Sequence, residues 1–127
     1  MSVTKEDLLQ LASDLCLCAA EVQWRAAVSR AYYGADHGCR AWHAAMPVPA
    51  STSGMQGGVH QQLLNQLGNG APEWSASQKM LGRVLSAHLR ALKDRRKIAD
   101  YDLDESFDQA LAASHCAAAG LLLSKLP

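Results

Sequence analysis

Two residues whose chemistry suits a phosphate ester lie seven positions apart in the segment Glu21 to Ala45, EVQWRAAVSRAYYGADHGCRAWHAA. Arg30 keeps its positive charge and can hold a phosphate in a planar fork. His37 titrates near neutral pH and can transfer protons. On a helix, this separation places both side chains on one face, about 10 Å apart along the axis. The pair could therefore bind a phosphodiester and move a proton at it.

Cleavage of RNA by its own 2′-hydroxyl needs a base, an acid and positive charge on the phosphorane. One arginine and one histidine are too few, but a two-fold axis through this helix face would bring two of each together. Tyr33 lies one turn from both and could position a phosphate or a base, and Ser29 lies beside the face. Asp36 could change the proton affinity of a neighbouring histidine. Alternatively, it could be solvated, because it lies about 100° away from the face around the helix axis. The alternative is structural, with Arg30 in an ion pair and His37 in a hydrogen bond across a dimer.

The segment predicts one long helix, ending before Pro47, with two different faces. An apolar stripe should face the core, and it contains Trp24, Val28, Ala31, Tyr32, Ala35, Cys39 and Trp42. The opposite face contains Gln23, Ala26, Arg30, Tyr33, Gly34, His37, Ala41 and Ala44. Solvated helix faces usually carry long charged side chains, so these small residues predict a second interface, where another helix or a ligand can come close.

Three segments in order along the chain resemble one protein family. Ser29 to Tyr33 reads SRAYY and is followed by His37, Gly58 to His60 reads GVH, and Arg96 to Tyr101 reads RKIADY. Together they resemble the HEPN family (higher eukaryotes and prokaryotes nucleotide-binding), in its Ser-Arg-Ala-Tyr-Tyr branch. The resemblance covers nearly the whole chain.

This resemblance implies a compact helical bundle that dimerises through the helix carrying the arginine and the histidine. In active HEPN members these residues of both protomers form a metal-independent endoribonuclease site. Many relatives are toxins or defence proteins, often paired with a nucleotidyltransferase-type antitoxin, and others are non-catalytic nucleotide-binding or interaction modules. Both functions stay open for this chain. The implied catalytic residues are Arg30 and His37, and the candidate supporting or binding residues are Tyr33, Ser29, Asp36, His60 and Arg96.

The remaining pattern predicts an all-α fold without strands. Thr4 with Asp7, and Ser75 with Gln78, match the capping box at which helices begin. Residues 46–58 are rich in proline, glycine and serine and predict a flexible loop. The expected helices cover 4 to about 20, 21 to about 46, 59–67, 75 to about 98, and 102 onward, the first two possibly continuous. We expect one domain, 1–127, folded as an antiparallel up-and-down bundle of four main helices and one short helix.

The formal net charge is zero, yet the charges are unevenly distributed. A basic run contains Lys79, Arg83, Arg90, Lys93, Arg95, Arg96 and Lys97, and an acidic run contains Asp100, Asp102, Asp104, Glu105 and Asp108. Cations at the end of one helix and anions at the start of the next would suit the two helix dipoles. Alternatively, the basic run marks a surface that binds RNA. Asp100 is an expected partner for Arg96.

The chain has four cysteines, without a secretory signal or an apolar run near 18 residues. These features predict a reduced, cytoplasmic protein with no membrane segment. The cysteine spacing does not match a metal site, so small buried hydrophobes are the better interpretation and neither metal nor cofactor is expected. Of the other histidines, His43 suits a packed or rim position, and His115 a structural one.

Overall fold

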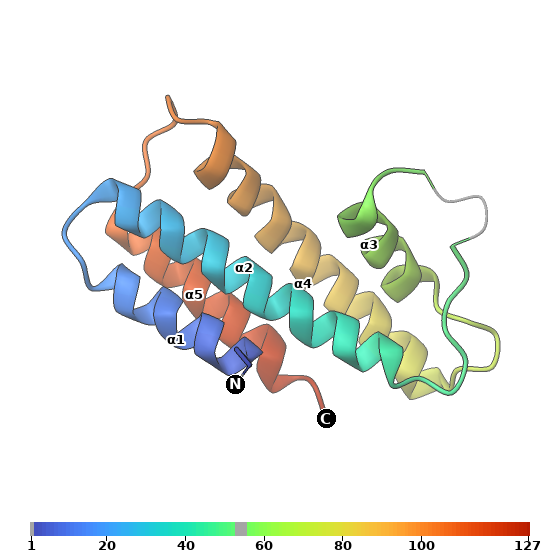
Figure 1. Ribbon diagram of the computed structural model, residues 1–127. Coiled ribbons are helices and arrows are strands. Elements are labelled where there is room, and N and C mark those ends of the chain that lie inside the picture. The colour runs from blue at the N-terminus through green and yellow to red at the C-terminus, as the bar shows by residue number, and fades with distance from the viewer. Residues whose placement is uncertain (1, 53–55) are drawn as a thin grey trace.

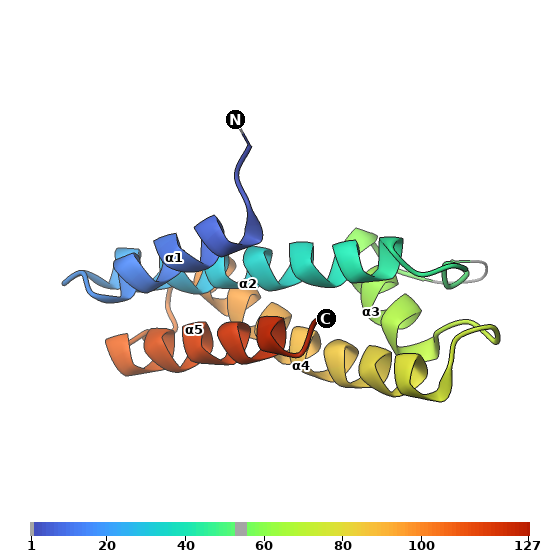
Figure 2. The same ribbon diagram turned by 90° about the horizontal axis from the view of Figure 1, so that it is seen from below.

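The computed structural model describes residues 2–52 and 56–127, and every regular element in these ranges is a helix. The helices are α1 (Lys5–Cys16), α2 (Glu21–Ala44), α3 (Val59–Asn69), α4 (Ala76–Tyr101) and α5 (Gln109–Ser124). Successive long helices run in opposite directions (Figure 1). Seen from below, α1 and α2 form one layer and α4 and α5 the other, with the short α3 against α4 (Figure 2). The predicted bundle of four main helices and one short helix is confirmed.

The helix starts follow their capping residues. Thr4 and Asp7 cap α1, and Ser75 caps α4 by accepting from the Gln78 backbone N–H at 3.1 Å. Two predicted boundaries are wrong. The helix α1 ends at Cys16, and four residues separate it from α2, which begins at Glu21. The last helix begins after Asp108, whose carboxylate accepts from the N–H three residues on, and residues 102–107 form a connection.

A buried arginine in α2, which sequence reasoning missed, holds that connection in place. Arg25 donates to the carbonyl oxygens of Ala99 at 3.0 Å and Asp102 at 3.1 Å, and also to Glu105. Its guanidinium lies over the Phe107 ring, 5.2 Å from the centroid. Five guanidinium donors in a planar fork can satisfy several carbonyls at once, which is what a buried helix end requires.

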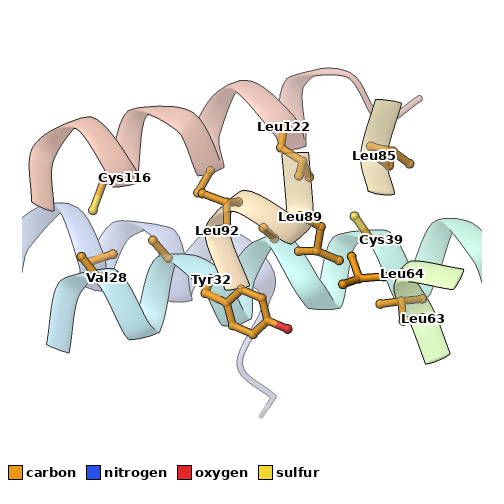
Figure 3. Packing of buried hydrophobic residues seen from close by; sticks show 14 of the residues in the cluster. Val28, Tyr32, Cys39, Leu63, Leu64, Leu85, Leu89, Leu92, Cys116 and Leu122 are labelled. Carbon is orange, nitrogen blue, oxygen red and sulfur yellow. The ribbon is translucent and has the colours of Figure 1, made fainter. Parts of the chain in front are cut away.

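The core lies along α2, as Figure 3 shows for Val28, Tyr32 and Cys39 beside leucines of α3, α4 and α5. The predicted apolar stripe of α2 is buried except for Trp24, which is half-buried. The apolar stripe predicted for the last helix consists of Phe107, Leu111, Ser114, Ala118, Leu121 and Leu122. It is partly wrong, because Ser114 and Leu121 are exposed. Alanine dominates α5 and makes its faces similar, so the residue pattern does not define which face packs inward.

Gly34, which was expected at the second interface, and the nearby Gly38 instead permit close packing within the chain. A Cβ on Gly34 would lie 3.2 Å from the Lys5 carbonyl oxygen, so α1 covers this position. A Cβ on Gly38 would lie 2.5 Å from the side chain of Leu123. The small residues at these two places are therefore explained by α1 and the C-terminal segment. Exposed small residues on the same helix include Ala41 and Ala44.

Two further sequence interpretations are resolved by the helix bounds and by the cysteines. The helix α4 continues to Tyr101, so its basic run lies inside the helix rather than in its last turn, and the helix-dipole explanation does not apply.

Cys16 of α1 and Cys116 of α5 are buried, and their Sγ atoms lie 3.2 Å apart. These thiols form a pair that the spacing of the cysteines did not indicate.

The loop predicted at 46–58 is irregular where the structure describes it, and residues 53–55 lie outside the described residues. Part of it is anchored, because Ala50 is buried and its N–H donates to His43 Nε2 at 3.0 Å. The Trp74 indole donates to the Val48 carbonyl at 2.6 Å.

None of the helices in the described ranges combines the length and apolarity needed to cross a bilayer.

Candidate functional site

The three segments that carry the family resemblance come together at one place, around two adjacent tyrosines of α2. We call this the tyrosine cluster. Its α2 members are Ser29, Arg30, Tyr32, Tyr33, Asp36 and Arg40; α3 contributes His60; and α4 contributes Arg96, Asp100 and Tyr101. Residues separated by tens of positions in sequence thus share aromatic, ionic and hydrogen-bonding contacts.

Arg96 forms the buried centre of the cluster on the α4 side. Its guanidinium lies over the rings of Tyr32, Tyr33 and Tyr101, with centroid distances of 5.2, 5.7 and 5.7 Å. The predicted partner is confirmed, since Arg96 Nη1 lies 3.4 Å from Asp100 Oδ2. Arg96 Nε has no hydrogen-bond partner among the described residues. A buried cation held by aromatic faces and one carboxylate stiffens the junction of α2 and α4.

Two polar side chains flank this centre on α2. Ser29 is buried, and its hydroxyl donates to Asp100 Oδ2 at 3.3 Å, so it braces the carboxylate that pairs with Arg96. Arg30 is half-buried, with its guanidinium over the Tyr33 ring at 5.2 Å. The structure gives Arg30 no carboxylate partner within the described residues, which leaves its charge available to an anion.

A second hydrogen-bonded group joins α2 to α3. Asp36 Oδ2 accepts from Arg40 Nε at 2.8 Å, and Asp36 Oδ1 lies 3.6 Å from His60 Nδ1. The Tyr32 hydroxyl lies 2.8 Å from His60 Nδ1 and 3.5 Å from Asp36 Oδ1. The alternative of a solvated Asp36 is therefore wrong: the side chain is buried, and the histidine beside it is His60 rather than its sequence neighbour His37.

The Tyr32 hydroxyl keeps its proton at any physiological pH. Burial, reinforced by the negative charge of Asp36, raises the pKa of Tyr32 well above its ordinary value. The hydroxyl is therefore always a donor, either to the imidazole of His60 or to the carboxylate of Asp36. It can also accept a hydrogen bond, so it links the two groups in either direction.

His37 lies apart from this network. It is exposed on α2, and it makes no hydrogen bond or ion pair with any residue of the ranges 2–52 and 56–127. The structure thus groups the predicted Arg30, Tyr33, Ser29, Asp36, His60 and Arg96 and leaves His37 outside. Asp36 and Tyr32 brace His60, and no comparable contact braces His37.

Sequence reasoning missed Arg40 and treated Tyr32 as a core residue only. The signal was present, because positions 32, 36 and 40 are spaced by four, which places tyrosine, aspartate and arginine in one row on a helix. The structure shows that the Tyr32 ring belongs to the core while its hydroxyl belongs to the polar network.

The cluster contains two carboxylates, a histidine and arginines, a set that suits anions better than metal ions. Within the described part of the chain, no group of three or more His, Cys, Asp or Glu side chains is placed to hold a metal ion. Comparison of the chain with protein-family models, with curated proteins and with solved structures gave no match. The resemblance to HEPN proteins thus rests on the residues of the three segments themselves.

Proposed function

We propose that the chain is a homodimeric, metal-independent endoribonuclease that cleaves RNA by attack of its own 2′-hydroxyl. The observation that carries the proposal is the convergence of the three family-like segments in the tyrosine cluster, with Arg30 unpaired by any described carboxylate at its edge. The basic side chains Arg83, Arg90, Arg95 and Lys97 are exposed along α4, which supports contact with a polyanion.

The chemistry proceeds by internal transfer at phosphorus. A base removes the 2′-hydroxyl proton while the 2′-oxygen bonds to phosphorus and the bond to the 5′-oxygen breaks. An acid returns a proton to the 5′-oxygen, so the products are a 2′,3′-cyclic phosphate and a 5′-hydroxyl. Arg30 would bind the phosphate and stabilise its developing charge, His37 would transfer protons, and Tyr33 would hold a base or a phosphate.

A second candidate is a non-catalytic HEPN-type dimer that binds nucleotides or another protein through the same surface. The observation that favours it is the exposed position of His37, because a catalytic histidine is usually held in orientation by a hydrogen bond to its second nitrogen. Under either candidate a role as a toxin or defence component, with a nucleotidyltransferase-type antitoxin, remains a prediction from the resemblance.

The test is cleavage of total RNA by the purified protein in excess EDTA, with Arg30→Ala and His37→Ala beside it. We expect cleavage by the wild type and a loss of about 100-fold or more in Arg30→Ala, and the rate of His37→Ala shows whether His37 transfers the proton. Inactive wild-type protein would contradict the nuclease proposal, and binding of RNA or a nucleotide without cleavage would then support the second candidate.

The dimer has its own readout. Gly34 is buried against α1, so a bulky residue there would disturb the fold of one chain and would report nothing on dimers. Ala41 is exposed on α2 and is the better probe. We expect Ala41→Trp to lower the molar mass measured by light scattering from dimer to monomer, with Val22→Trp, at another exposed α2 position, as the control. A wild-type protein that is monomeric at high concentration would contradict the homodimer.

A further inference from the structure

We propose that His60 is a proton-transfer residue of the tyrosine cluster and that Asp36 and Tyr32 are its positioning residues. The inference rests on the proposed cleavage of RNA and assigns a part of that reaction to α3. It changes the expected pair in one chain from Arg30 and His37 to Arg30 and His60.

The first argument is the placement of His60 relative to Arg30. The Tyr33 ring lies 5.2 Å from the Arg30 guanidinium carbon and 6.2 Å from the His60 ring centroid, so one aromatic side chain contacts both. A phosphate held by Arg30 beside this ring would lie near the imidazole. His37, by contrast, is two helical turns from Arg30 and makes no hydrogen bond, ion pair or ring contact with the cluster among the described residues.

The second argument is the orientation of the imidazole. Its Nδ1 faces α2, 2.8 Å from the Tyr32 hydroxyl and 3.6 Å from Asp36 Oδ1. The other nitrogen, Nε2, has no hydrogen-bond partner in the described ranges, and the side chain is 34% exposed. A histidine fixed through one nitrogen and open at the other is the arrangement that proton transfer requires.

The hydrogen-bonded network of Tyr32, Asp36 and His60 accommodates both the neutral and the protonated imidazole of His60. With Nδ1–H donating to Tyr32 and the Tyr32 hydroxyl donating to Asp36, the Nε2 lone pair can accept the 2′-hydroxyl proton. The resulting imidazolium keeps its Nδ1–H toward Tyr32 and lies near the Asp36 carboxylate, which stabilises its charge. It can then return the proton from Nε2 to the 5′-oxygen.

The charges around His60 come from two helices, α2 and α4. Asp36 and Arg40 of α2 form an ion pair at 2.8 Å, and Arg40 also donates to the Val59 carbonyl beside His60. From α4, the Arg96 guanidinium lies over the Tyr32 and Tyr33 rings, and Lys93 donates to the neighbouring Gln61. Asp36 is the one acidic group within 4 Å of the imidazole among the described residues, and a positioning role for it follows from that proximity.

The decisive variant is His60→Asn, because the asparagine amide can occupy the place of Nδ1 and keep the contacts to Tyr32 and Asp36 but cannot titrate. We expect cleavage in EDTA to fall by about 100-fold or more, with an unchanged KM for a fluorescent oligoribonucleotide and an unchanged melting temperature. His88→Asn, at a half-buried histidine of α4 outside the cluster, should leave cleavage at the wild-type rate. If His60→Asn does not fold, His60→Gln takes its place.

Tyr32→Phe and Asp36→Asn test the positioning roles, and both should lower kcat while leaving KM nearly unchanged. A folded His60→Asn protein that cleaves within about threefold of the wild-type rate would overturn the assignment of His60 alone and leave the proposed nuclease standing. Wild-type protein without cleavage would overturn the proposed function, and the assignment with it. Loss in His60→Asn together with normal cleavage by His37→Ala would support His60 as the principal histidine.

Discussion

At the scale of single residues, buried polar side chains of this bundle are held in one protonation state. His115 of α5 is buried, and its Nε2 has no hydrogen-bond partner among the described residues. Burial, with a smaller contribution from the nearby charge of Arg95, lowers the pKa of His115 to about 4. The folded chain therefore keeps this imidazole neutral at a pH where an exposed histidine would be half protonated.

This histidine predicts a loss of stability in mild acid. The unfolded chain binds its proton near pH 6.5 and the folded chain near pH 4, so the stabilisation by neutral His115 is complete above pH 6.5 and declines as the pH falls toward 4. The full effect is at most about 3 kcal/mol. Urea unfolding at pH 7.5 and pH 5 measures it, and His115→Asn should show a smaller difference between the two. An equal difference in wild type and variant would contradict the assignment.

At the scale of elements, the contacts between helices depend on where side chains are missing. The helices α3 and α4 approach so closely that a Cβ on Gly82 would lie 2.5 Å from the Leu67 carbonyl oxygen and 3.3 Å from the Trp74 ring. A backbone atom cannot turn aside as the end of a side chain can. Gly120 of α5 is different, because a Cβ added there would have a Leu9 methyl group as its nearest neighbour, at 3.8 Å.

These two glycines predict opposite effects of the same substitution. Gly82→Ala should destabilise the chain by about 1–3 kcal/mol, because α3 must move away from α4. Gly120→Ala should stabilise it by about 0.5–1 kcal/mol, because alanine favours the helix and meets only ordinary van der Waals contact. Thermal unfolding of both variants beside the wild type measures the difference. Equal shifts in one direction would show that the close approach at Gly82 is not needed.

The helices were largely predictable because helix starts and apolar stripes depend on residues close together in sequence. Thr4, Ser75 and the periodicity of α2 act within a few positions, and the structure follows them. The start of α5 was not predictable, since Arg25 binds the connection before α5 from another helix. The end of α1 was not predictable either, since no glycine or proline marks it. Nor does sequence alone say whether Gly34 meets a second chain or α1 of its own.

At the scale of the whole molecule, α2 is the element to which the other helices bring their polar residues. Sequence reasoning found most of the tyrosine cluster through the three family-like segments, and it offered Asp100 as one possible carboxylate partner of Arg96. It did not find the Asp36–Tyr32–His60 network, because that network depends on where α3 lies relative to α2. Distances between helices are properties of packing, and no periodicity within one helix contains them.

The paired thiols of Cys16 and Cys116 also have a consequence for the molecule as a whole. They lie 100 positions apart, so a bond between them would convert nearly the entire chain into a covalent ring with two short tails. Oxidised glutathione can make that bond by two successive exchanges, each releasing one reduced glutathione. Burial raises the pKa of Cys116 to about 12, which keeps the exchange slow at neutral pH.

We expect prolonged incubation with oxidised glutathione at pH 9 to lower the intact mass by two hydrogens and to increase mobility on a non-reducing denaturing gel. Cys116→Ala should abolish both changes, and Cys18→Ala should keep them; a ring that forms without Cys116 would contradict the pairing. In the chain-entropy model, a ring of this size restricts the unfolded chain and so raises the free energy of unfolding by about 4–5 kcal/mol. The first and last helices would then be unable to separate, and a pulling force applied at the termini would bypass the loop, α3, α4 and the tyrosine cluster entirely.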